Sequence, residues 1–453
     1  MVRGGALASA RFSSSVRQAV RAAIWGHYHG GNLGDELVVA SLADAIRARQ
    51  PEAQIVAVSQ APADTSLRHG LETFPLAPSI LPRPASRPSA TSKSRWRSRL
   101  RASARRIPPL RQLWRSYRAL SAALGDVAFS FQARRFLQSV DILVVAGSGQ
   151  LMDKFYGPFG HPYALFRWCS LARLTRTSVL LPSVGAGPLT HPLSRFFVRR
   201  ALARAAYVSV RDVASAGVLH AVGVRRPLPV VPDMAWASTA AWRAAAAVGE
   251  RPRVGSRVVG LNVMAHEDPR YWSRGDLDRY TRYLGTMATF ARWLLENGYT
   301  VRIFSSQNRA DEAPARELLQ LLESQGDFAS GKLVWSIDPS AGAEDLIETI
   351  VDCDLVVAAR YHSILLPLLL GIPTIGLAYN HKTTELMRGV GLPQWCFDID
   401  AASAADLCTA LESLWNYWPS YRPRVHDIAL RNRLAVERQF DFLFGASGPA
   451  FRD

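Results

Sequence analysis

The chain has 453 residues, 48% of them hydrophobic and 9% aromatic, so it is long enough for two domains with large cores. Its net charge of +17 is concentrated between residues 81 and 135, and the rest of the chain is nearly balanced; this argues against a uniformly basic, nucleic-acid-binding protein. The four cysteines lack close paired spacing, which argues against a disulfide framework or a zinc site and fits a reducing compartment.

The N-terminal part of the chain predicts a leader followed by a βαβ unit. Residues 1–21 contain Ser and Arg but no uninterrupted apolar stretch, which predicts a disordered leader; a transit peptide is the alternative. Residues 22–25 and 54–59 predict strands, and the helical periodicity of residues 36–49 lies between them. This order implies a parallel sheet, and we expect the N-terminal α/β domain to cover residues 22–245.

A basic insertion interrupts this domain at about residues 81–135. It holds thirteen arginines and one lysine against a single acid, Asp126. Residues 73–110 are rich in Pro, Ser and Arg and predict a loop, partly disordered. Parts of residues 95–120 mix apolar and basic positions and predict an amphipathic helix on an anionic membrane; the alternative is a solvated surface insertion.

Two further series of strands follow the insertion. The first completes the N-terminal domain at residues 141–146, 178–183, 206–210 and 228–231. Residues 242–257 predict a connection, and the second series belongs to a C-terminal α/β domain at residues 255–440, with strands at 258–263, 300–304, 332–335, 355–358 and 374–377. We therefore expect two Rossmann-like parallel-sheet domains facing a cleft, where ligands are often bound.

The most informative motif is the Arg-Tyr-His-Ser sequence of residues 360–363. It follows an apolar run with the length and β-branched content of a buried parallel strand, and it precedes a helix-like run. Arg360 and His362 should therefore lie at a strand's carboxyl end, where open α/β sheets bind ligands. Arginine offers a fork for carboxylate or phosphate, and histidine a proton donor or acceptor. The alternative is a histidine that only caps the helix.

Three glycine turns also follow predicted strands. Asn32, Gly34 and Asp35 open the first helix, whose N-terminal N–H groups suit an anion, although Asn32 or Asp35 could simply cap that helix. Gly147 and Gly149 form the second turn, and Gly185 begins the third. Together they predict close backbone approach to a ligand at one sheet edge, whereas each alone is more often only a turn.

Two cationic residues follow other strands. Arg211 comes after residues 206–210, and its alternative role is a surface pair with Asp212. Lys382 is one of four lysines and lies beyond the strand at 374–377. The chain has no zinc-protease, Cys-x-x-Cys, nucleophile-elbow or Walker pattern. Its longest apolar region is broken by Pro367, Gly371 and Pro373 and is too short to span a membrane.

Taken together and in order, these residues resemble the polysaccharide pyruvyl transferase family. The resemblance rests on residues 31–36, the turn after Val145, and residues 185–188, 209–212, 232–233, 360–363, 379–382 and 389–392. It implies a fold like that of the two-domain GT-B glycosyltransferases. It also implies transfer of a pyruvyl group from phosphoenolpyruvate to a sugar as a cyclic ketal, in the synthesis of an exopolysaccharide or cell-wall polymer.

The chemistry of phosphoenolpyruvate fits the residues singled out above. Arg360 and Arg211 suit its carboxylate and phosphate, with Lys382 or the loop of Asn32 and Asp35 helping. His362 is the expected general acid and base. This scheme calls for neither a metal nor a cofactor. The other expected partner is a sugar or lipid-linked saccharide, and the expected location is the cytoplasm, with peripheral membrane contact through residues 81–135.

Two departures from the family and two alternative functions remain open. The turn after Val145, usually three glycines in the family, has serine at position 148, and the basic insertion is longer than the family leads us to expect. A nucleotide-sugar glycosyltransferase would share the fold, with Glu385 as a weak candidate for ribose binding. A non-enzymatic scaffold would dock through the basic insertion.

Overall fold

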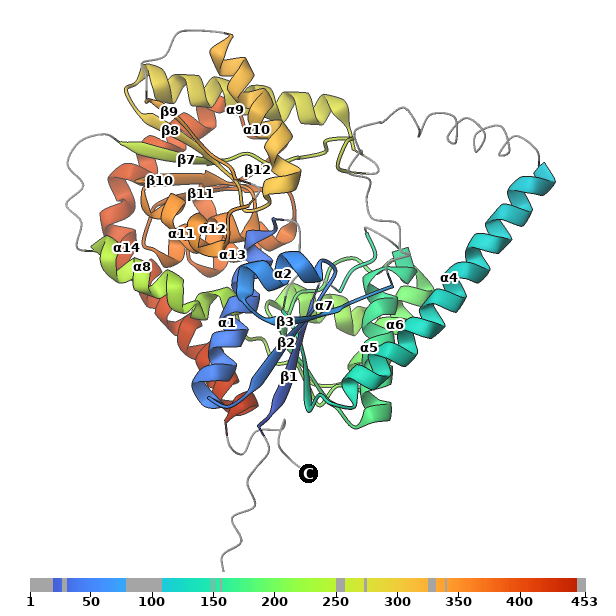
Figure 1. Cartoon of the computed structure of the whole chain (residues 1–453). Coiled ribbons are helices and arrows are strands. Elements are labelled where there is room, and N and C mark those ends of the chain that lie inside the picture. Colours follow the sequence, from blue (N-terminus) through green and yellow to red (C-terminus); the bar gives the residue numbers. More distant parts are fainter. Residues whose placement is uncertain are drawn as a thin grey trace, which may run out of the picture.

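The computed structural model contains two parallel α/β domains that pack against each other (Figure 1). It describes residues 19–26, 31–78, 108–147, 149, 151–154, 157–249, 257–272, 275–324, 331–338 and 340–445, with only the backbone described for 108–119 and 248–249. Most of the predicted leader and residues 81–107 of the basic insertion lie outside these ranges.

The N-terminal domain is built on a six-stranded parallel sheet in the order β3-β2-β1-β4-β5-β6. Its strands are β1 (Arg21–Trp25), β2 (Gln54–Ser59), β3 (Glu72–Pro75), β4 (Ile142–Val145), β5 (Ser178–Val184) and β6 (Tyr207–Val210). Its helices are α1 (Leu33–Arg49), α2 (Pro62–His69), α4 (Pro108–Leu137), η1 (Gly157–Phe159), α5 (His161–Thr175), α6 (Pro192–Leu202), α7 (Val213–Ala221) and η2 (Met234–Ala237). The central strands β1 and β4 are almost wholly buried, as their apolar runs predict.

The C-terminal domain repeats this design with the order β12-β11-β10-β7-β8-β9. Its strands are β7 (Val258–Asn262), β8 (Thr300–Phe304), β9 (Leu333–Ser336), β10 (Leu355–Ala358), β11 (Thr374–Ala378) and β12 (Cys396–Asp398). Its helices are α8 (Thr239–Gly249), α9 (Leu277–Glu296), α10 (Asn308–Glu323), α11 (Ala343–Val351), α12 (Tyr361–Leu369), α13 (His381–Gly389), η3 (Pro393–Trp395) and α14 (Ala404–Phe444).

Both sheets have the strand order of a Rossmann fold. Successive strands are added toward one edge of the sheet and then toward the other, and this order reverses between β1 and β4 in the first sheet and between β7 and β10 in the second. The predicted fold class is therefore confirmed. Ligands of such sheets bind beyond the carboxyl ends of the strands at these reversal points. The segments after β1, β4 and β10 are therefore the first places to look for a site.

Several local predictions were wrong. The βα pattern continues past Ala61 through α2 and β3, so residues 73–75 are strand and not loop. Residues 228–231 make only an isolated bridge, between Val210 and Val230, and β12 was not predicted. The predicted connection at 242–257 contains most of α8. These elements are short, edge-located or partly exposed, and their sequences lack the apolar periodicity of the core strands.

The two domains are joined by more than a linker. Helix α14, coloured red in Figure 1, begins in the C-terminal domain and ends beside α1, where Arg49 pairs with Glu437 at 2.7 Å. One continuous apolar cluster includes core residues of both sheets. The backbone also joins them, because the Leu33 N–H donates to the Ser306 carbonyl at 2.8 Å. Large apolar contacts of this kind restrain relative domain motion.

Candidate functional site

The candidate site lies where the carboxyl ends of the two sheets meet. His362 occupies the first turn of α12, directly after β10, and Gly34 occupies the first turn of α1, after β1. A Cβ on Gly34 would lie 1.9 Å from Nδ1 of His362 and 2.3 Å from Cγ. Only glycine allows the imidazole to approach so closely. His362 of the C-terminal domain therefore packs directly against the backbone of Gly34 in the N-terminal domain.

Asp233 faces the other side of the same imidazole. It is 1% exposed, and its Oδ1 accepts the N–H of Ala235 at 3.0 Å and lies 3.7 Å from Nε2 of His362. Burial alone would raise the pKa of Asp233, but the interactions with His362, Arg211 and the Ala235 N–H hold that pKa below its usual value. Nε2 is buried and has no hydrogen-bond partner in the described part of the chain. A carboxylate whose charged form is favoured thus lies close to this histidine nitrogen.

Arg211 connects this pair to the glycine turns. It follows β6 and donates from Nη1 to Asp233 at 3.1 Å and from Nε to Asp212 at 3.3 Å. Its guanidinium carbon lies 4.3 Å from the centre of the Tyr361 ring. A Cβ on Gly185 would lie 2.9 Å from Nε. Nη2 makes no hydrogen bond or ion pair with a described residue, so it can bind an anion.

Lys382 adds a second cation from the C-terminal domain. It lies in the first turn of α13, where Asn380 caps its N–H at 2.9 Å. A Cβ on Gly149 would lie 2.7 Å from Nζ, and a Cβ on Gly185 would lie 3.3 Å from the Cα of Gly149. Burial, followed by repulsion from Arg211, lowers the pKa of Lys382 to about 7. An anionic ligand would stabilise its charged form.

The predicted loop after β1 also contributes. Asn32 caps α1 and donates from Nδ2 to Asp35 at 2.6 Å. Burial raises the pKa of Asp35 to about 6, with Asp233 adding to the shift and His362 opposing it. The capping role weighed from the sequence is therefore present. It does not exclude ligand contact, because Asp35 stays electrostatically coupled to the site.

The remaining two predicted residues have other contacts. A Cβ on Gly147 would lie 2.5 Å from the carbonyl oxygen of Pro182, so backbone packing already requires glycine there. Arg360 directs Nε and Nη2 at the fully buried Asp311, at 3.1 and 2.6 Å, and its N–H donates to Asn262 at 3.0 Å. Its Nη1 makes no hydrogen bond or ion pair with a described residue. Donor binding by Arg360 and Gly147 stays a prediction.

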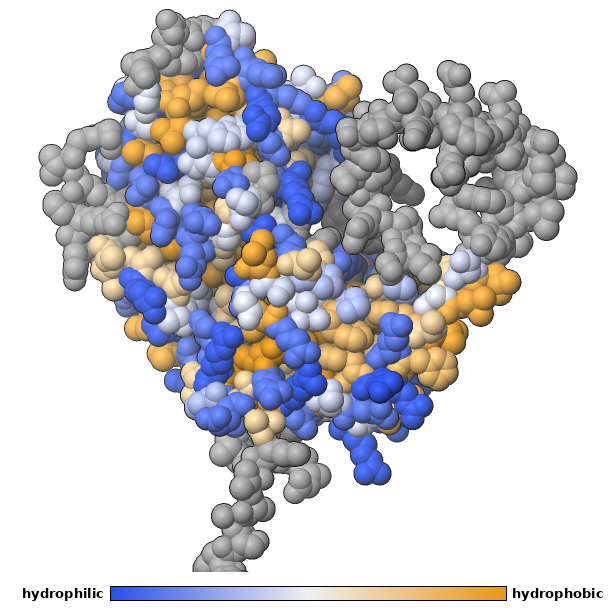
Figure 2. All heavy atoms as spheres, viewed as in Figure 1, coloured by the Kyte–Doolittle hydropathy of each residue, from blue (hydrophilic) through white to orange (hydrophobic). Residues whose placement is uncertain are grey.

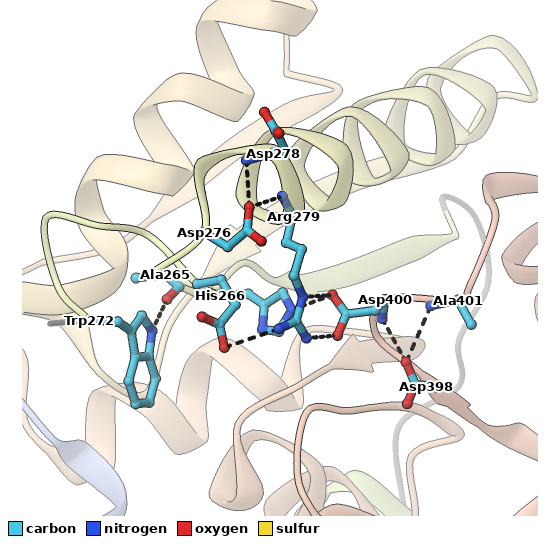
Figure 3. A network of polar contacts seen from close by, with 10 residues as sticks. Ala265, His266, Trp272, Asp276, Asp278, Arg279, Asp398, Asp400 and Ala401 are labelled. Carbon is cyan, nitrogen blue, oxygen red and sulfur yellow. Dashed lines mark hydrogen bonds and ion pairs between the residues drawn. The ribbon is translucent and has the colours of Figure 1, made fainter. Parts of the chain in front are cut away.

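A pocket of about 400 Å³ opens at the ends of β11 and β12, and His381, the sequence neighbour of Lys382, belongs to its lining. Its walls include Arg279, Tyr379, Asn380, Thr384, Phe397 and Asp398. Figure 3 shows the network that fixes one wall: Asp400 accepts from Arg279 and lies 2.9 Å from Nε2 of His266. The bond from Arg279 lowers the pKa of Asp400 to about 2, although burial opposes this. The pocket therefore has rigid polar walls with aromatic side chains between them.

Sequence reasoning missed two buried carboxylates. Asp233 belongs to the Pro-Asp pair at residues 232–233, which contributed to the family resemblance but received no role. Its signal was an acid directly after the strand-like run at 228–231. Asp311, in the first turn of α10, carried no comparable signal. The described residues contain no group of three or more His, Cys, Asp or Glu arranged to hold a metal ion.

This fold is that of a two-domain α/β protein, and its candidate site lies between two Rossmann-like sheets. Similar solved structures agree at the level of fold. A putative UDP-N-acetylglucosamine 2-epimerase from Listeria monocytogenes has a TM-score of 0.54 at 10% identity, over 94% of this chain and 96% of that one. The UDP-GlcNAc 2-epimerase from Methanocaldococcus jannaschii has a TM-score of 0.51 at 12% identity, over 88% and 93%.

A family comparison is more specific. The model of the polysaccharide pyruvyl transferase family matches residues 32–381, so the chain belongs to that family and is a transferase. The predicted family membership is thereby confirmed. No curated protein matches the chain significantly in sequence. Among the helices described, none has the length and apolar character needed to cross a membrane.

Proposed function

We propose that the protein transfers a pyruvyl group from phosphoenolpyruvate to two hydroxyls of a sugar, forming a cyclic ketal in an exopolysaccharide or cell-wall polymer. The observation that supports this best is the meeting of His362 with two cations, Arg211 and Lys382. Each cation keeps a nitrogen, Nη2 and Nζ respectively, that is not bonded to the described residues. A small anion with a carboxylate and a phosphate complements two such donors.

The reaction needs one acid–base group near the donor's methylene carbon. Protonation of that carbon makes the neighbouring carbon electrophilic, and a sugar hydroxyl adds to it and loses its proton. Phosphate then leaves with the electrons of its carbon–oxygen bond, and the second hydroxyl closes the ketal. One hydroxyl proton balances the new methyl group and the other ends on phosphate. No cofactor enters this scheme, because phosphoenolpyruvate itself is the activated donor.

We assign these proton transfers to His362. Gly34 fixes the ring from one side and Asp233 lies 3.7 Å from Nε2 on the other. A positioned acid–base group contributes about 10²–10⁴-fold to the rate. We therefore expect His362→Ala to lose about that much kcat while phosphoenolpyruvate still binds. Full activity in this variant would refute the assignment.

Calorimetry on the purified protein tests the donor directly. We expect saturable binding of phosphoenolpyruvate that Arg211→Ala abolishes. Arg316→Ala is the matched control, because the Arg316 side chain is 59% exposed on α10, where it pairs with Glu312 and lies 5.0 Å from the centre of the Trp335 ring. Binding of nucleoside diphosphates without phosphoenolpyruvate would instead favour a nucleotide-sugar glycosyltransferase.

We propose that the acceptor saccharide binds in the pocket at the ends of β11 and β12. Carboxylate, amide and hydroxyl groups with adjacent aromatic rings suit the hydroxyls and apolar faces of a sugar. Thr384→Trp would fill part of this pocket. We expect it to raise the acceptor KM at least about tenfold, because a filled subsite loses its contacts. The phosphoenolpyruvate KM should not change; if both KM values rise together, the pocket is not a separate acceptor subsite.

We also propose that the protein works in the cytoplasm on a saccharide that is lipid-linked, at the inner face of the membrane. The basic insertion at residues 81–135 supports this, since arginines next to a bilayer are attracted to anionic lipid.

A further inference from the structure

Helix α4 has one face packed on the N-terminal domain. Phe129, Ala133 and Leu137 on this face are buried. Phe129 lies 6.3 Å from the ring of Trp168 in α5, and Phe136 stacks on Phe74 of β3 at 4.3 Å. These contacts fix the orientation of the helix, so its opposite face is also defined.

The opposite face carries a line of exposed apolar side chains. Leu120, Leu124, Val127 and Phe131 are 60%, 62%, 54% and 67% exposed. Their spacing of four, three and four residues places them in one stripe, about 17 Å long at about 1.5 Å per residue. Figure 1 shows α4 as a long helix that runs outward from the domain, and Figure 2 shows apolar surface on its described part. Single exposed apolar residues are ordinary, but an ordered stripe marks an interaction surface.

The charge around this stripe is strongly positive. Arg134 and Arg135, about one helical turn after Phe131, are exposed. The segment at residues 81–135 contains one acid, Asp126, and that carboxylate is already bonded to Arg167 and Tyr163 of α5. Cationic groups beside an apolar helical stripe are typical of a helix that lies in a membrane interface.

We propose that the apolar stripe of α4 docks on an anionic lipid bilayer, with the stripe entering the headgroup region and the arginines contacting lipid phosphates. A second copy of the chain fits less well, because it would bring two segments of the same positive charge together without acidic partners. The inference builds on the membrane location proposed above. It does not depend on the donor or on pyruvyl transfer.

Vesicle sedimentation of the full chain tests this proposal. We expect binding to vesicles of equal parts phosphatidylcholine and phosphatidylglycerol, weaker binding as salt increases, and little binding to pure phosphatidylcholine. The double variant Leu124→Glu and Phe131→Glu should bind at least about tenfold more weakly, because burying even one such side chain in an apolar layer is worth about that factor. Leu67→Glu with Leu277→Glu is the matched control, since both residues are exposed and lie on other helices.

Three results would overturn the proposal. The first is that the double variant Leu124→Glu and Phe131→Glu sediments with anionic vesicles as fully as the wild type does. The second is that the wild type binds neutral and anionic vesicles equally. The third is a wild-type dimer in analytical ultracentrifugation that the stripe variant loses without lipid, which would assign the stripe to a second copy. Phosphoenolpyruvate calorimetry on the same preparations separates this outcome from failure of the proposed function, and retained binding shows that the variants are folded.

Discussion

Replacing Gly34 with alanine should displace His362 and remove most of the activity. The added Cβ would lie 1.9 Å from Nδ1, whereas ordinary contacts begin near 3.4 Å, so the ring must move by about 1.5 Å. A misplacement of about 1 Å can cost about 10²-fold in rate, and overpacking typically costs about 1–3 kcal/mol of stability. We therefore expect kcat to fall at least about 10²-fold, measured by phosphate release with phosphoenolpyruvate and acceptor.

Two further variants make this prediction specific. Gly217→Ala is the control, because Gly217 lies in α7 and nothing is within 4 Å of its added Cβ; it should keep wild-type kcat and gain up to about 1 kcal/mol. Combining Gly34→Ala with His362→Ala removes the ring but keeps the Cβ of residue 362, which would lie 2.7 Å from the added Cβ. Urea unfolding should therefore show that stability returns in part. Wild-type kcat in Gly34→Ala, or no recovery in the double variant, would refute the contact between Gly34 and His362.

Three other substitutions test the charges around this contact. Lys382 has a pKa of about 7, so the affinity of the wild type for phosphoenolpyruvate should fall as the pH rises through 7. Lys382→Met should remove this pH dependence. An equally steep pH profile in the variant would exclude Lys382 from donor binding. Asp233→Asn removes the negative charge facing Arg211 and should lower the free energy of unfolding, measured in urea, by about 3–5 kcal/mol. A decrease of less than about 1 kcal/mol would show that this ion pair is no stronger than one on the surface. Arg360→Lys should raise the phosphoenolpyruvate KM, because lysine cannot reproduce the guanidinium fork; lower stability with an unchanged KM would limit Arg360 to holding Asp311.

The sequence was most informative where apolar runs are long and continuous. The strands Gln54–Ser59 and Leu355–Ala358 were predicted with their observed bounds, because a buried parallel strand must be apolar on both faces. Edge strands have no such requirement: β3 is partly exposed and β12 has three residues, and both were missed. Helix α4 was only partly anticipated, because its packed face depends on α5 and β3, which are distant in sequence.

The site was predictable as a set of strand ends but not as a set of contacts. Parallel topology brings His362, Arg211 and Lys382 to the same side of their sheets, and their order after strands is visible in the sequence. Which cation stays available depends on tertiary partners. Arg360 is held by Asp311, whereas Lys382 faces Gly149, and neither neighbour could be inferred from spacing alone.

The long helix α14 links domain docking to the geometry of the site. Its Gln439 accepts from the Ser209 hydroxyl at 2.5 Å and donates to the Ser183 hydroxyl at 3.0 Å. Ser183 has a φ of +48°, a backbone conformation costly for serine. Its carbonyl oxygen would lie 2.7 Å from a Cβ on Gly147. The C-terminal helix thus stabilises the strained end of β5, while His362 rests on Gly34 across the same interface. His362 and the glycine turns are therefore aligned by the contacts that join the two domains, which preorganises the candidate site.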